Sequence, residues 1–151
     1  MYSLTYMSLT GLDVFDRTVH TTNRWLQELT GLLDGGSRHD AYVALRATLH
    51  ALRDRLPVEE TAELAAQLPM LVRGFYYEGW DPTGKPVRER SLEGFLAGVA
   101  VELPIDADPE PVARAVFALL ARRVSDGEIQ DVKGVLPTPI RQLWPAAPRA
   151  A

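Results

Sequence analysis

The sequence predicts an all-α protein in which two tandem copies of a three-to-four-helix unit pack into one compact, bundle-like domain. Three observations predict this fold class. Apolar residues recur every three or four positions along most of the chain, which is the period of an amphipathic helix. No strand-like alternation of any length occurs. A segment of the first half also aligns with a segment of the second half without a gap.

The composition supports a folded domain and argues against several functional classes. Hydrophobic residues make up 46% of the 151 residues, which lies in the range of globular domains. The absence of cysteine excludes disulfides, thiolate metal sites and thiol catalysis. A net charge of −4 gives no broad basic footprint, so we expect no nucleic-acid partner.

No membrane association is expected either. No apolar run approaches the roughly 20 residues that a bilayer-spanning helix requires. Residues 1–7 lack both a charged start and a continuous apolar stretch, so they resemble neither a signal peptide nor an anchor.

The expected helices of the first half follow from their capping and breaking residues. We expect the first helix to be capped by Thr10 and to end at the glycine pair Gly35-Gly36. Asp40 is the expected N-cap of a second helix. Pro57 opens a third helix, and Pro69 separates it from a short fourth one.

The second half is expected to contain a similar series of helices with their own capping residues, after one long connecting segment. Residues 81–90 are rich in turn-forming steps. Ser91 and Asp108 are expected to cap the next two helices, and Ser125 with Glu128 forms a capping box for another. The expected organisation is a first helical unit at 11–80, a connecting segment at 81–90, a second helical unit at 91–145 and a disordered tail at 146–151.

The internal repeat aligns residues 40–76 with residues 108–144. The identical pairs are Asp40/Asp108, Arg46/Arg114, Ala47/Ala115, Leu52/Leu120, Arg55/Arg123, Glu60/Glu128, Leu68-Pro69/Leu136-Pro137 and Arg73/Arg141. Features that both copies keep are best explained by what both copies need to fold. Features found in one copy only are therefore the better candidates for function.

The unshared feature is an aromatic and basic segment that begins where the second copy ends. The candidate ligand- or partner-binding residues are Arg73, Tyr76, Tyr77, Trp80, Lys85 and Arg88. Aromatic rings beside basic groups can form a recognition surface. Alternatively, Tyr76 and Trp80 fold back and seal the two units together. Arg73 either offsets the carboxyl end of a helix dipole or contacts an anion.

No catalytic residue, metal site or cofactor is predicted. Asp16 with His20, and His50 with Asp54, have the spacing of neighbours on one helix face, but two ligands without a third indicate ion pairs in solvent. A cluster of acidic residues is expected to compensate a helix dipole on a solvated face. Its members are Glu59, Glu60 and Glu63.

One segment resembles a known family. The sequence Ala-Ala-Gln-Leu-Pro-Met-Leu-Val-Arg-Gly-Phe-Tyr-Tyr-Glu-Gly-Trp-Asp-Pro at 65–82, followed by Arg-Glu-Arg-Ser-Leu-Glu-Gly-Phe-Leu at 88–96, is similar to the bacterial DUF 2267 family, and the likeness extends over about residues 11–145. The resemblance implies a small cytoplasmic bacterial helical protein. It implies no activity, cofactor or catalytic residues.

Three functional hypotheses follow. The first is a non-catalytic protein-interaction or regulatory module that engages an unknown protein partner or a second copy of itself through the aromatic segment at residues 75–88 and neighbouring helix faces. The second is a sensor that binds a small anionic ligand between the two units, held by Arg73 and Tyr76. The third, which has the least support, is an enzyme whose site is assembled from distant residues.

Overall fold

The computed structural model describes residues 8–146, and this range contains eight helices and no strand. The helices are α1 (Asp13–Leu32), α2 (Arg38–Arg53), α3 (Val58–Ala66), α4 (Met70–Tyr77), α5 (Leu92–Ala100), α6 (Pro109–Arg123), α7 (Asp126–Val135) and α8 (Thr138–Arg141). The prediction of an all-α fold is confirmed. Residues 1–7, and residues 147–151 of the predicted disordered tail, lie outside the described residues.

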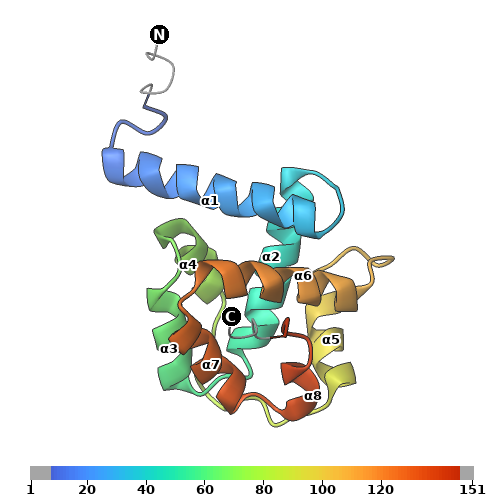
Figure 1. The fold of residues 1–151 in the computed structure, drawn as a ribbon. Coiled ribbons are helices and arrows are strands. Elements are labelled where there is room, and N and C mark those ends of the chain that lie inside the picture. Colours follow the sequence, from blue (N-terminus) through green and yellow to red (C-terminus); the bar gives the residue numbers. More distant parts are fainter. Residues whose placement is uncertain (1–7, 147–151) are drawn as a thin grey trace, which may run out of the picture.

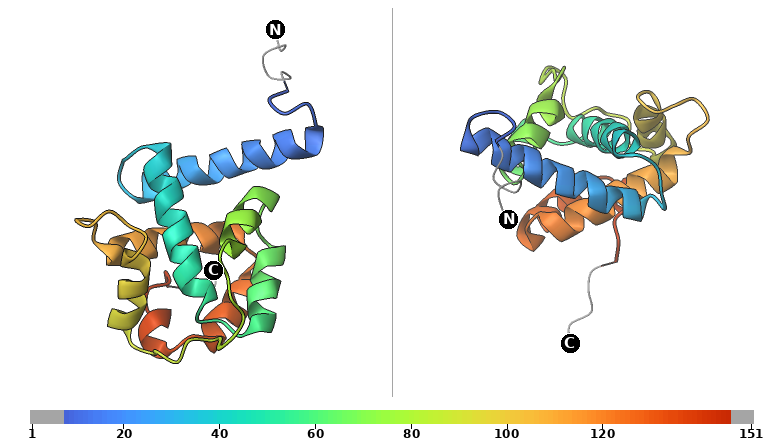
Figure 2. Two further views of the ribbon diagram at one scale, coloured as in Figure 1. Left: turned by 180° about the vertical axis from the view of Figure 1, so that it is seen from behind. Right: turned by 90° about the horizontal axis from the view of Figure 1, so that it is seen from above.

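The helices are arranged around α2. This helix contacts α1, α4, α5 and α6, while α3 packs against α7 (Figure 1). The longest helix, α1, crosses one end of the molecule, and its first turns extend past the body (Figures 1 and 2). The central position of α2 explains why residues on all of its faces are buried, including the consecutive residues Leu49, His50, Ala51 and Leu52.

Two helix starts differ from their predicted positions. The N-cap of α1 is Leu12, which makes no side-chain capping bond, so the prediction of Thr10 is wrong. The Thr10 hydroxyl instead donates to the carboxylate of Asp16 at 2.8 Å. The N-cap of α2 is Ser37, and Asp40 is the partner that completes its capping box. Asp40 is therefore the N3 residue of the box, and the prediction that it is the N-cap is wrong.

The caps of the second half agree more closely with the predictions. Ser91 and Asp108 cap α5 and α6 as predicted, and Ser125 accepts a bond from the backbone N–H of Glu128. The reciprocal bond expected from the Glu128 side chain is not formed, because this side chain is buried and the backbone N–H of Ser125 donates instead to Oε1 of Gln67 at 3.2 Å. Pro69 directly precedes α4, as expected.

Several paired features agree with an internal duplication. Leu68-Pro69 separates α3 from α4, and Leu136-Pro137 separates α7 from α8. The guanidinium of Arg73 donates to the carbonyl of Leu68 at 2.9 Å, and that of Arg141 donates to the carbonyl of Leu136 at 3.0 Å. These contacts do not establish a duplication by themselves. The repeat and the unit boundaries that were derived from it stay predictions.

Candidate functional site

Two of the six candidate residues are used by the fold itself. Tyr76 is fully buried, and its hydroxyl donates to the carbonyl of Thr61 at 3.0 Å. Burial raises the pKa of this phenol well above its usual value. Arg73 donates to the carbonyls of Ala65 and Leu68, both at 2.9 Å, and so caps the carboxyl end of α3. Tyr76 is therefore not a surface residue. Arg73 lies on α4, but the helix dipole that it offsets is that of α3.

The other four candidates are at least partly accessible. Tyr77 and Trp80 are half-buried, and their ring centroids lie 5.4 Å apart. The indole Nε1 of Trp80 is shielded from solvent and has no hydrogen-bond partner among the described residues. Lys85 is half-buried and Arg88 is exposed. The structure thus brings the two rings together, while the two basic groups lie further along the connection.

The end of this aromatic segment is held by α2. Arg53, which is buried, donates from Nη1 to the carbonyl of Tyr76 at 2.5 Å and to that of Glu78 at 2.9 Å. The Nε2 of His50 lies 2.6 Å from the carbonyl of Phe75. The last carbonyls of a helix have no partner within the helix, and cationic groups satisfy them. The face of α2 thus fixes the carboxyl end of α4.

A network of charged groups extends from this anchor. The Nδ1 of His50 lies 2.6 Å from a carboxylate oxygen of Glu102, which follows α5. Arg46 bridges Glu102 at 2.5 Å and Glu78 at 2.7 Å. Since both ring nitrogens of His50 face oxygen acceptors, the imidazole donates to both only when both carry hydrogen. The prediction that His50 and Asp54 form an ion pair is wrong, because Asp54 contacts Arg53 instead.

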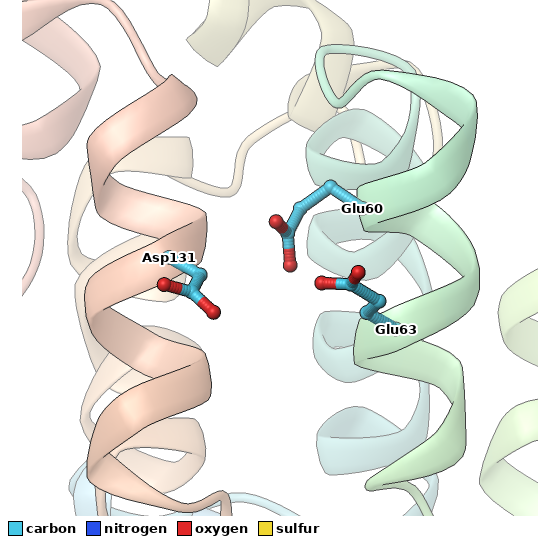
Figure 3. A group of neighbouring side chains, drawn as sticks. All are labelled: Glu60, Glu63 and Asp131. Atoms are coloured by element: carbon cyan, nitrogen blue, oxygen red, sulfur yellow. The ribbon is translucent and has the colours of Figure 1, made fainter.

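A second cluster lies where α3 packs against α7. Glu60 and Glu63 come from α3, and Asp131 comes from α7 (Figure 3). Each of the three offers a carboxylate oxygen, and these oxygens all lie within 4.8 Å of one another. Glu60 is only 9% exposed, so the prediction that it belongs to a solvated face is wrong. Neighbouring Glu60 raises the pKa of Glu63.

A fourth carboxyl group adds to this cluster. Glu128, on α7, is 8% exposed, and burial together with the carboxylate of Glu60 raises its pKa. Glu60 and Glu128 are the aligned residues of the predicted repeat. Sequence reasoning missed the cluster, although the matching acidic pairs at 60/63 and 128/131 were a visible signal. Among the described side chains these carboxylates are the best candidates for holding a metal ion.

The third feature is a group of exposed apolar side chains. Five exposed residues at the start of α1 and of α4 form what we call the α1–α4 apolar surface: Leu12, Val14, Phe15, Met70 and Leu71. The two helices meet where the backbone N–H of Leu71 donates to the hydroxyl of Thr18 at 3.0 Å. Grooves of about 560 Å³ and 540 Å³ lie beside this contact, and Leu71 lines the first while Val14 and Met70 line the second.

The fold and these clusters of side chains identify the class of protein to which the chain belongs. The protein is a small all-α protein in which α2 anchors an aromatic segment and a carboxylate cluster joins α3 to α7. Within residues 8–146, no helix combines the length and apolar character needed to cross a bilayer. The chain belongs to the DUF2267 family, described as an uncharacterized conserved protein, whose model matches residues 22–143. No curated protein matches the chain.

Proposed function

We propose that the protein is a non-catalytic interaction module that pairs with a second copy of itself through the α1–α4 apolar surface. The observation that carries the proposal is the exposure of apolar side chains on helix turns that extend past the body. Phe15 is 46% exposed, Leu12 is 48% exposed and Val14 is 43% exposed. Contiguous apolar side chains in contact with water favour an interaction surface.

A second copy is the occupant that this geometry favours. The helix that presents the apolar turns also forms a wall of both grooves, through Thr22 and Leu26 in one and through Val14 and Trp25 in the other. A two-fold pair of identical chains can therefore cover the projecting turns of each copy with a groove of the other. Such self-complementary pairing is the commonest arrangement of homo-oligomers.

The two other expectations receive less support. The aromatic segment keeps Tyr77, Trp80, Lys85 and Arg88 partly accessible, but its rings pack on one another and its start is anchored by Arg53. We give it a structural role. The anion sensor would rest on Arg73 and Tyr76, whose polar groups are already bonded to backbone carbonyls.

Analytical ultracentrifugation of the wild type and of Phe15→Glu tests the proposal. The wild type should sediment as a dimer with a dissociation constant of roughly 1–100 µM. The charged variant should be monomeric, with an unchanged circular dichroism spectrum, because residue 15 is exposed in the monomer. Val101→Glu is the matched control, because Val101 is 82% exposed and lies outside the surface. A wild type that stays monomeric at high concentration, or a dimeric Phe15→Glu, would refute the proposal.

A further inference from the structure

The carboxylate cluster between α3 and α7 brings acidic groups together without a basic side chain beside them in the described part of the chain. Glu60, Glu63 and Asp131 point toward one another across the two helices (Figure 3). Within the described part of the chain, none of these three, and not Glu128 either, forms an ion pair with a lysine, arginine or histidine. Like charges at this separation repel one another strongly.

Two members of the cluster are also deeply buried and lack partners. Glu60 and Glu128 are 9% and 8% exposed, and within residues 8–146 the Oε2 atom of each is shielded from solvent and accepts no hydrogen bond from a basic, amide or hydroxyl donor; the partners within reach of Glu60 are other carboxyl groups. An ionised carboxylate with no partner in the interior is strongly unfavourable. The position must therefore gain either protons or a cation. Burial raises the pKa of Glu128, and the neighbouring carboxylate of Glu60 raises that of Glu63.

We propose that Glu60, Glu63 and Asp131 bind a calcium ion, with the buried Glu128 beside Glu60. The donors are carboxylate oxygens only, a set that hard cations prefer over transition metals. The three oxygens all lie within 4.8 Å of one another, which is close enough for each of them to contact one ion at Ca²⁺–oxygen distances of about 2.4 Å. Magnesium requires shorter bonds and a near-ideal octahedron, whereas calcium accepts irregular sets of carboxylate oxygens such as one from two separate helices.

Calcium at this position would join the two halves of the molecule. Glu60 and Glu63 lie on α3 in the first predicted unit, and Asp131 lies on α7 in the second. A ligand that binds the folded state but not the unfolded state stabilises the folded state. Binding is thus expected to raise the melting temperature and to strengthen the α3–α7 contact. This inference does not depend on self-association.

The test uses the full chain after treatment with EDTA. Isothermal titration calorimetry with CaCl₂ is expected to give a dissociation constant of roughly 10 µM to 1 mM. The melting temperature should rise by several degrees at millimolar CaCl₂, and less in MgCl₂. In the double variant Glu63→Gln, Asp131→Asn this rise should be lost. Because both side chains are exposed and their mutual repulsion is removed, the metal-free variant should melt at or above the temperature of the wild type.

A second double variant serves as the control. Glu93→Gln, Asp106→Asn removes two exposed carboxylates outside the cluster and should keep the full calcium response. The site is overturned if the wild type shows neither heat nor a melting shift with CaCl₂, MgCl₂ or MnCl₂ up to about 5 mM, above the usual range of such sites. It is equally overturned if Glu63→Gln, Asp131→Asn responds like the wild type. A larger response to MgCl₂ than to CaCl₂ overturns the assignment of the ion.

Discussion

Replacing Arg53 by methionine should destabilise the protein far more than replacing an exposed arginine. Methionine keeps much of the aliphatic packing but cannot bond to the carbonyls of Tyr76 and Glu78, which Arg53 reaches at 2.5 and 2.9 Å. Hydrogen bonds from charged donors contribute about 1.5–3 kcal/mol each, and their loss leaves the end of α4 without partners. Removing a buried charge also recovers part of its desolvation cost.

The net loss should therefore be about 2–4 kcal/mol. For a chain of 151 residues, this corresponds to a fall of roughly 5–15 °C in the melting temperature. Differential scanning calorimetry measures the fall, with Arg24→Met as the control because Arg24 is exposed. Hydrogen exchange should also quicken at the amides of α4. If Arg53→Met melted within a degree or two of Arg24→Met, the view that α2 fixes the end of α4 would be wrong.

Two further predictions concern an ion pair and the aromatic segment. Burial raises the pKa of Glu28, but hydrogen bonds from Arg122 and Arg123 outweigh this effect, so the pKa of Glu28 lies below its usual value. Glu28→Gln should therefore lower the free energy of unfolding by about 1 kcal/mol at pH 7. This difference in stability from the wild type should vanish as the pH falls below the folded-state pKa of Glu28, because the protonated carboxyl no longer pairs with the arginines. A difference in stability that does not change with pH would contradict this account. Trp80→Ala should lower the stability by about 1–3 kcal/mol, measured by urea denaturation, because the ring packs on Tyr77. If the midpoint of urea denaturation did not change, Trp80 would again be a candidate for binding a partner.

The helices could be predicted because their causes are local. Ser91, Asp108 and Ser125 bond to backbone N–H groups two or three positions along the chain, so short sequence patterns reveal them. The same locality explains the errors. Ser37 and Asp40 both have the chemistry of a cap, and the sequence does not say which of them starts α2.

The candidate site was predicted less well, because its chemistry is not local. His50 pairs with Glu102 rather than with Asp54 four positions away. No rule for spacing along one helix reveals such a partner. The sequence left open whether Tyr76 lies on a binding surface or packs inside the protein, and the structure buries it, because the face of α4 that turns inward is decided by what packs against it.

The sequence alone determined that the chain is helical, where most helices begin, and which segments resemble each other. Periodicity, capping residues and prolines act within a few residues, so they can be recognised without a three-dimensional structure. Only the tertiary structure decided that Glu60 and Glu63 meet Asp131 and that the first turns of α1 stay uncovered. Both outcomes depend on how helices distant in sequence pack together, because the charge and exposure of a side chain are set by its neighbours in space.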